Sequence, residues 1–463
     1  MAAAAAERHA QVARSRTLSR MSMEPAVASL TASQRHAYER NLRVYYVFKL
    51  LSEMWLLLPI WVAYLLLERG LSVGEVTLIE APFWLAVAVS EVPTGAVADR
   101  WGRRTSLILG ALTTAVAILA FGLASTLPLI LLSYLVWAVA MTFTSGADSA
   151  LLYDSLKQLG REREFERIAG RGAAMLAVGL VIATLAGGPV AKAIGLQETI
   201  FLSAGTMLLA ATAAWMFTEP PHRSAGESVS YRAGLRLAAA TVRGAPPVRA
   251  IIPLGAVLMA GTVVLVVLSQ PFLLSHGYSV GWEFSLLQVP LAMTGILGGL
   301  LAFRLLRRAG MAGTMSTLVL IVVVAYVGAA LWNNVGAIAF LALIPLARSI
   351  TEPTVAGYIN HRVPSGQRAT VLSLHSVAFS LALAPIMPIL GFSADELDLT
   401  MAFAAAAGLI GGLSLLTGAL WLRAHRSHPL PEEPALIARE GLPLAPEHAF
   451  AAPLESGLEV REE

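Results

Sequence analysis

Six of the ionisable side chains inside long, largely uncharged stretches of the sequence stand out as candidates for chemistry. Five are carboxylic acids and one is a guanidinium: Glu53, Glu80, Glu91, Asp148, Glu352 and Arg348. A charge at the centre of a membrane costs about 2.5–3.5 kcal/mol on insertion scales, so ionisable residues there are functional candidates by default. A desolvated carboxyl group also holds and releases a proton more readily near neutral pH. These six residues are therefore candidates for proton or substrate handling.

Structural roles compete with this interpretation. Arg348 and Glu352 are four residues apart, so they can pair on one face of a helix. Glu91 stands just before Pro93 and could serve helix packing. His375 could titrate as well, although we expect a hydrogen-bonded structural histidine there.

The composition shows which class of protein contains these groups. Of 463 residues, 56% are hydrophobic and 14% charged, against about 25% charged in soluble proteins. This excludes a secreted or cytosolic enzyme, and the absence of cysteine excludes a disulfide scaffold. A net charge of +3 is no basis for binding nucleic acid. The chain is predicted to be a polytopic membrane protein.

About 20 apolar residues form a membrane-spanning helix, and twelve stretches qualify. In the first half they are 44–67, 75–98, 105–124, 128–156, 172–191 and 198–217. In the second half they are 249–274, 282–303, 312–331, 335–357, 369–392 and 399–422. Strands are not expected, because no segment alternates with a period of two. The fold class expected is all-α, with twelve transmembrane helices.

The distribution of arginine and lysine sets the orientation. All but four of the 33 basic residues fall in the tails and in alternate loops, the exceptions being Arg69, Lys192, Lys49 and Arg348. Basic residues favour the cytoplasmic side, so both termini are predicted to be cytoplasmic. The first forty residues contain no apolar stretch typical of a secretory signal.

A polar linker at 218–248 divides the predicted spans six and six, and residues 231–243 within it are predicted to form a basic interfacial helix. The expected organisation is a tail, a bundle, the linker, a second bundle and a second tail: 1–43, 44–217, 218–248, 249–423 and 424–463. The loops 95–104 and 299–308 share Gly, Ala and three Arg at a constant offset, which indicates internal duplication. Many secondary transporters are built from such repeats.

The loop after the second predicted span resembles the signature loop of the major facilitator superfamily. Its matching residues are Gly95, Asp99, Arg100, Gly102, Arg103 and Arg104. The resemblance covers residues 40–425. It implies two pseudo-symmetric six-helix bundles around a central cavity, working by alternating access, with spans 1, 4, 7 and 10 lining that cavity.

We interpret this loop as part of a cytoplasmic gate. Asp99 would accept hydrogen bonds from arginines or helix N-terminal groups of the opposite half when the protein opens outward, and release them when it opens inward. The alternative is a plain positive-inside anchor, which explains the arginines but not Asp99 with its glycines. Asp154 and Arg171 are candidates for the same network, or for a separate structural pair.

No phosphate-binding loop, metal-ligand cluster or hydrolase constellation is present in the sequence. We therefore expect no enzyme activity and no cofactor. Gly187-Gly188-Pro189 resembles the core of the antiporter signature of drug exporters in the superfamily, although the arginine that those exporters usually carry in span 4 is missing.

The function predicted is proton-coupled export of a small amphiphilic organic compound, in the manner of a drug:proton antiporter. The Ala-, Gly- and Arg-rich composition favours a bacterial inner membrane, and we expect a monomer whose partners are substrate, protons and lipid. One alternative is uptake of a nutrient or organic anion, which Arg348 would suit. Another is a receptor or regulator that binds a ligand without moving it.

Overall fold

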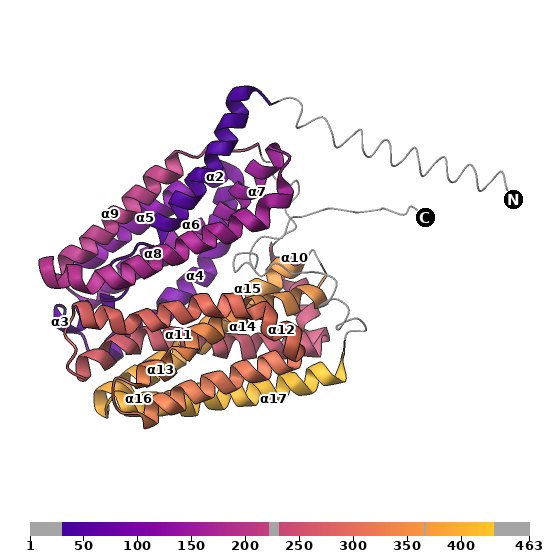
Figure 1. The fold of residues 1–463 in the computed structure, drawn as a ribbon. Coiled ribbons are helices and arrows are strands. Elements are labelled where there is room, and N and C mark those ends of the chain that lie inside the picture. The colour runs from indigo at the N-terminus through magenta and orange to yellow at the C-terminus, as the bar shows by residue number, and fades with distance from the viewer. Residues whose placement is uncertain (1–29, 222–230, 365–366, 430–463) are drawn as a thin grey trace.

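The computed structural model describes residues 30–221, 231–364 and 367–429, which form two helical bundles and contain no strand (Figure 1). The first bundle contains α2 (Ala32–Ser52), α3 (Trp61–Leu67), α4 (Val73–Trp101), α5 (Arg103–Leu123), α6 (Leu127–Thr144), α7 (Ala147–Gln158), α8 (Phe165–Ile194) and α9 (Leu196–Trp215). A 3₁₀ turn, η1 (Glu162–Glu164), joins α7 to α8.

The linker region contributes α10 (Tyr231–Gly244), where the sequence predicts an interfacial helix. The second bundle contains α11 (Pro246–Ser275), α12 (Trp282–Leu331), α13 (Ala337–Leu341), α14 (Leu343–Arg362), α15 (Arg368–Glu396), α16 (Leu399–Ala406) and α17 (Gly412–Ser427). A π-helical turn, η3 (Ala407–Gly411), joins α16 to α17.

Within the described residues, ten helices are long and apolar enough to cross a membrane. One of them, α12, contains both predicted spans 282–303 and 312–331, because its backbone leaves helical geometry only at Gly310, with φ of 64° and ψ of −178°. The all-helical membrane fold is thus confirmed. The number of twelve crossings stays a prediction.

The prediction of one continuous helix over 44–67 is wrong. Helix α2 begins earlier, at Ala32, because Thr31 and Gln34 form a capping box there. It ends at Ser52, and helical structure resumes only in α3 at Trp61. Pro59 stands within the interruption and has no N–H to donate.

The predicted span 128–156 is also interrupted. Helix α6 ends at Thr144 and α7 begins at Ala147, with Gly146 between them in the left-handed region at φ 72°. Glycine adopts that conformation without steric cost. Two of the six spans predicted for the first bundle are therefore broken.

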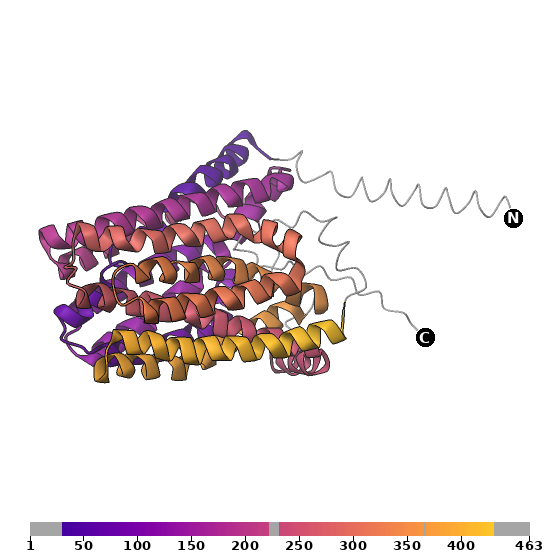
Figure 2. The same cartoon turned by 60° about the horizontal axis from the view of Figure 1, so that its bottom comes forward.

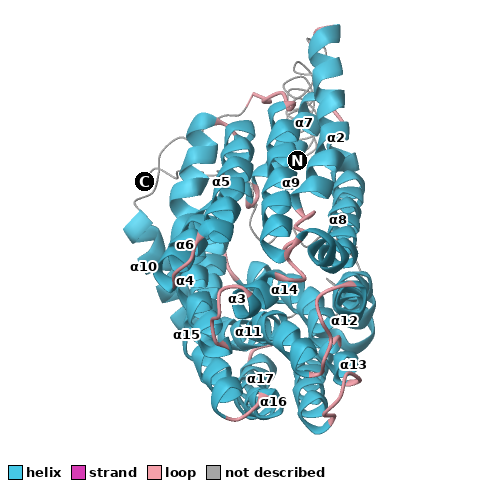
Figure 3. Ribbon diagram, turned by 90° about the vertical axis from the view of Figure 1, so that its left-hand side faces the viewer, coloured by secondary structure: helices cyan, strands magenta, loops and turns pink. Residues whose placement is uncertain are grey.

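The two ends of the molecule differ. The start of α2 and the end of α17 lie at one end, which we call the inner end, and α3, α13 and α16 lie at the opposite, outer end (Figures 1 and 2). Figure 3 views the molecule from the outer end.

The bundles contact each other mainly through α4 with α15 and α8 with α12. Gly391 of α15 packs on Thr77 of α4, and Gly188 of α8 packs on Gly281 at the start of α12. These contacts lie in the outer half of the helices. The two bundles therefore meet most closely at the outer end.

Candidate functional site

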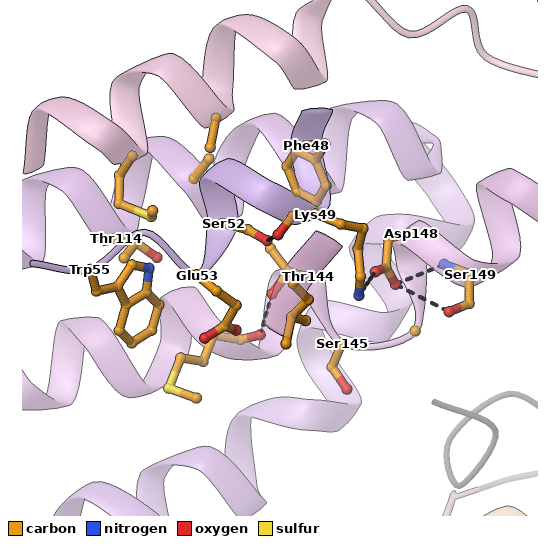
Figure 4. A pocket seen from close by; sticks show the side chains of 16 residues that line it. Phe48, Lys49, Ser52, Glu53, Trp55, Thr114, Thr144, Ser145, Asp148 and Ser149 are labelled. Atoms are coloured by element: carbon orange, nitrogen blue, oxygen red, sulfur yellow. Dashed lines mark hydrogen bonds and ion pairs between the residues drawn. The ribbon is translucent and has the colours of Figure 1, made fainter. Parts of the chain in front are cut away.

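A cavity of about 270 Å³ lies inside the first bundle, where both interrupted spans have their breaks (Figure 4). Its polar lining consists of Lys49, Ser52, Glu53, Thr114, Thr144, Ser145, Asp148 and Ser149. Phe48, Trp55, Met141 and Leu176 are among its apolar lining residues. Two of the six intramembrane candidates, Glu53 and Asp148, thus share one cavity.

Lys49 and Asp148 form a buried ion pair at this cavity. The Lys49 Nζ atom lies 2.9 Å from Asp148 Oδ2, and the residues are only 4% and 8% exposed. Asp148 Oδ1 also accepts a hydrogen bond from the backbone N–H of Ser149, at 2.7 Å. Lys49 is in the last turn of α2 and Asp148 in the first turn of α7. Each charge therefore complements the dipole of its own helix.

Glu53 terminates α2 as its C-cap residue and brings a second carboxylate to the cavity. Figure 4 shows its side chain extending into the cavity beside Trp55. Glu53 follows Lys49 by four residues, which places the two side chains on similar faces of the helix. The cavity therefore combines one ammonium group with two carboxyl groups.

The break after α2 is held partly by the first bundle. The hydroxyl of Ser203 accepts the N–H of Leu57 at 2.8 Å, and the hydroxyl of Thr206 donates to the carbonyl of Met54 at 2.9 Å. In a membrane a backbone group without a partner costs several kcal/mol. These bonds make the interruption a stable part of the fold.

The second bundle supplies further hydrogen bonds to the break and to the first turn of α3. Gln270 Oε1 accepts the N–H groups of Val62 and Ala63 at 3.0 and 3.1 Å, and its Nε2 donates to the carbonyl of Leu58 at 3.0 Å. Gln288 Nε2 donates to the carbonyl of Pro59 at 3.0 Å. The break is thus a point at which both bundles bind the same segment.

Glycines on α8 make room for this segment. A Cβ atom at Gly179 would lie 2.3 Å from the carbonyl oxygen of Leu50, and one at Gly187 would lie 2.4 Å from that of Leu56. Real Cβ atoms do not approach that closely. The backbone around the break therefore packs directly on α8 at these two glycines, where any side chain would collide with it.

Aromatic side chains continue from the cavity toward the other bundle. Ring centroids are 5.2 Å apart between Trp55 and Trp137, and also between Trp84 and Phe379 of the second bundle. Phe83 links the two pairs, with ring centroids 6.2 Å from Trp137 and 5.2 Å from Trp84. The indole N–H groups of Trp55 and Trp137 are buried without a partner among the described residues.

The other intramembrane candidates lie apart from this cavity. Glu80 is 5% exposed and accepts a hydrogen bond from Trp84 Nε1 at 3.0 Å. Glu91 is partly buried further along α4. The Arg348 Nε and Glu352 Oε2 atoms are 3.9 Å apart on α14.

A smaller cavity of about 60 Å³ in the second bundle is lined by Glu352 and His375. The Nε2 atom of His375 is buried without a partner among the described residues, and it lies against Gly255 of α11. The expectation of a hydrogen-bonded structural histidine is therefore not met at this atom.

The sequence can now be placed among known proteins. The family model described as Major Facilitator Superfamily matches residues 50–387. The chain belongs to this superfamily. It is a multi-pass membrane transporter and not an enzyme. No curated protein shows significant sequence similarity to it.

Solved transporter structures share its fold. The nucleoside transporter NupG aligns with a TM-score of 0.67 and 14% identity, covering 84% of this chain and 99% of NupG. A bacterial homologue of the human lysosomal transporter Spinster, in an inward-facing and unoccupied conformation, aligns with a TM-score of 0.63 and 18% identity, covering 86% and 98%. An auto-inhibited POT family peptide transporter gives 0.65 and 14%, covering 84% and 98%.

The residues that resemble the signature loop of the superfamily lie at the inner end, where Gly95, Asp99 and Arg100 are in the last turns of α4, Gly102 separates the two helices, and Arg103 and Arg104 begin α5. The Arg103 guanidinium pairs with Asp154 of α7. Glu219 accepts the backbone N–H groups of Arg103 and Arg104, at 2.8 and 2.7 Å, and so caps the start of α5. Gly102 adopts φ 92° and approaches the Glu219 carboxylate. These residues are thus bound by α7 of their own bundle and by the start of the linker.

The remaining residues of this region are more accessible. The exposed residues are Gly95, Asp99, Arg100 and Arg171.

The connection between α7 and α8 contains an ion pair. The side-chain hydrogen bond from Arg161 lowers the pKa of Glu164 in η1.

Several important residues were not among the candidates from sequence, and Lys49, Gln288 and Glu219 are examples. Lys49 carried a signal, because it is a cation within a predicted span and precedes Glu53 by one helical turn. Gln288 and Glu219 carried none, because an amide in a span and an acid in a linker are ordinary by themselves.

Proposed function

We propose that this transporter is proton-coupled and exports a small amphiphilic organic compound from the cytoplasm of a bacterium, across its inner membrane. The observation that carries the proposal is the cavity at the two helix breaks, whose lining contains the Lys49–Asp148 ion pair and a second acidic residue, Glu53. Discontinuous helices commonly form the binding sites of secondary transporters.

Glu53 and Asp148 are proposed to exchange the proton. When Asp148 takes up a proton, its ion pair with Lys49 is lost, and Lys49 can turn to the carboxylate of Glu53. Because the pair joins α2 to α7, losing it frees the two half-helices to move relative to each other. Proton binding is thereby coupled to a change in the shape of the cavity. Glu80, Glu91 and Glu352 remain secondary candidates.

The aromatic side chains support an amphiphilic substrate. Trp55, Phe83 and Trp137 provide apolar and π surface beside the cavity, and two indole N–H groups there have no partner among the described residues. A ligand with an apolar body and at least one hydrogen-bond acceptor satisfies both features.

We further propose that the inner end faces the cytoplasm, as the basic loops predict. The described contacts between the bundles gather at the outer end, so this conformation would be open to the cytoplasm. Asp99 is exposed in it, as a released gate residue would be. The bundles 44–217 and 249–423 are proposed to rock as two bodies, in a monomer.

The test is transport in proteoliposomes with a pH-sensitive dye inside. Substrate-dependent proton movement is expected in the unmodified protein and is expected to be lost in Glu53→Gln. Glu68→Gln is the matched control, because Glu68 is exposed at the outer end, away from the cavity. Substrate movement without proton movement would refute the coupling, and ligand binding without any movement would refute the transport of that ligand.

Uptake of an organic anion is the second candidate, because the side chain of Arg348 stays 42% exposed and its Nε is 3.9 Å from Glu352. An imposed pH gradient decides the direction once the orientation in the liposomes is known from proteolysis of the tails. Loss of anion uptake in Arg348→Gln, with no export in the unmodified protein, would favour this second function.

A further inference from the structure

We infer that Asp395 is a gate residue of the outer side, which closes that side by capping helix α4 across the two bundles, and that it alternates with Asp99 at the inner end. The inference goes beyond the proposed substrate and coupling, because it concerns which side of the transporter is open.

The contact itself is direct. Asp395 Oδ1 accepts the backbone N–H of Val73 at 2.9 Å, and Oδ2 accepts that of Gly74 at 2.8 Å. Val73 and Gly74 are the first residues of α4, so their N–H groups have no partner within the helix. The positive end of the helix dipole adds to the attraction for a carboxylate.

The position of Asp395 in its own helix makes this contact informative. It lies in the last turn of α15, where the helix dipole disfavours a negative charge. Nothing local to α15 explains a carboxylate there. The start of α4 in the opposite bundle does.

The first bundle provides hydrogen-bond acceptors for only some of the N–H groups at the start of α4. The hydroxyl of Ser72 accepts the N–H of Glu75 at 3.2 Å, and the carboxylate of Glu75 accepts the N–H of Ser72 at 2.9 Å. The N–H groups of Val73 and Gly74 depend on the second bundle. If the bundles separated at the outer end, these two N–H groups would have only water as a hydrogen-bond acceptor.

Close packing surrounds the contact. A Cβ atom at Gly391 would lie 1.9 Å from Thr77 Oγ1, and one at Gly74 would lie 2.5 Å from the ring of Phe392. The two helices therefore approach as closely as their glycines allow. That approach brings the carboxylate within hydrogen-bond distance.

The register of the two helices relates Asp395 to Asp99. Val73 contacts Asp395, Thr77 packs on Gly391, and the carbonyl of Trp84 accepts the Ser380 hydroxyl, so the helices run antiparallel. Extended along α4, this register sets Asp99, near the C-terminal end of α4, opposite the start of α15.

Each helix thus carries an aspartate near its C-terminus that faces the N-terminus of the other helix. Here Asp395, which is itself exposed to solvent, accepts two hydrogen bonds from the start of α4. Asp99 is exposed at the inner end. The observed contact of Asp395 and the contact expected of Asp99 in the other state would be reciprocal locks at opposite ends of the protein. Engagement of Asp395 stabilises the state that is closed at the outer end.

The absence of cysteine in the sequence allows spin labels to be placed in pairs without background labelling. Glu68→Cys with Leu397→Cys reports on the outer end, and Lys157→Cys with His361→Cys reports on the inner end. All four residues are exposed in the structure. Distances are measured by pulsed electron spin resonance in lipid nanodiscs, and no substrate is needed.

Asp395→Ala is expected to move the population about tenfold toward the outward-open state, which corresponds to about 1.4 kcal/mol, because two hydrogen bonds to a charged group are lost. The outer distance lengthens and the inner one shortens. Asp395→Asn keeps one acceptor oxygen and is expected to shift less. Asp398→Asn is the matched control, because Asp398 caps Met401 within its own bundle, at 2.7 Å.

Adding Asp99→Asn to Asp395→Ala is expected to restore part of the inward-open population, because the opposing lock is then weakened too. Distance distributions in Asp395→Ala that match those of Asp398→Asn would overturn the inference. Failure of proton coupling in the liposome assay would leave these distances unchanged, so the two proposals fail separately.

Discussion

The Lys49 ammonium lies 2.9 Å from the Asp148 carboxylate where the last turn of α2 meets the first turn of α7. Only 6% of the Lys49 side chain and 11% of the Asp148 side chain are exposed. The pair therefore fixes two interrupted spans to each other inside the bundle.

Removing one partner of this pair leaves a buried charge without compensation. We expect Lys49→Met to reduce the free energy of unfolding by about 3–5 kcal/mol, as is typical when one member of a buried ion pair is lost. The double variant Lys49→Met with Asp148→Asn is expected to recover most of that loss. Thermal unfolding in detergent measures both. A double variant as unstable as the sum of its two single variants would contradict the prediction.

The amide of Gln270 connects the second bundle to the break in the first. In Gln270→Leu, the N–H groups of Val62 and Ala63 lose their acceptor, which is expected to cost about 1–3 kcal/mol of stability. Gln270→Glu at acidic pH, where the carboxyl group is protonated, keeps an acceptor oxygen for both N–H groups and a donor for the carbonyl of Leu58, so it is expected to be less damaging there.

The control for Gln270 is Gln197→Leu. Gln197 donates to the carbonyl of Gly122 at 2.7 Å within its own bundle. Both leucine variants are expected to lower the melting temperature, but only Gln270→Leu should also lengthen the distance between labels at Glu68 and Leu397. Equal outer distances in the two variants would show that Gln270 has no part in joining the bundles.

Gly179 and Gly170 offer a matched pair on one helix. A Cβ at Gly179 would meet the carbonyl of Leu50, whereas nothing lies within 4 Å of one at Gly170. We expect Gly179→Ala to destabilise the protein by about 1–3 kcal/mol, as overpacking does. Gly170→Ala is expected to stabilise it by up to about 1 kcal/mol, because alanine is the better helix former. Melting temperatures that shift in the same direction for both would refute the close packing of α2 on α8.

Sequence alone indicated the membrane fold because span length and charge position are local properties. The basic residues of the inner loops and the intramembrane carboxylates of Glu53 and Asp148 can be found without knowing any contact. Lys49 could have been added by the same reasoning, since it stands in a predicted span.

The helix breaks could not be predicted in this way. Residues 44–67 are apolar enough for a continuous helix, and Pro59 is the only proline among them. What stabilises the break is a set of side chains far away in the sequence: Ser203, Thr206, Gln270 and Gln288. Their hydrogen bonds exist only after the bundles have assembled. The same holds for Asp395, whose partner is 322 residues away.

Glu219 gives the last prediction, at the inner end. Its carboxylate caps α5 by accepting the N–H groups of Arg103 and Arg104, and Gly102 offers no side chain for that purpose. We expect Glu219→Ala to cost about 0.5–2 kcal/mol of stability, as the loss of an N-cap does. Because the signature loop would then be less firmly held, the transport rate should fall as well. Glu166→Ala is the control, since Glu166 is an exposed acid in the first turn of α8. Equal losses of stability and transport in the two variants would mean that Glu219 acts only as a nearby negative charge.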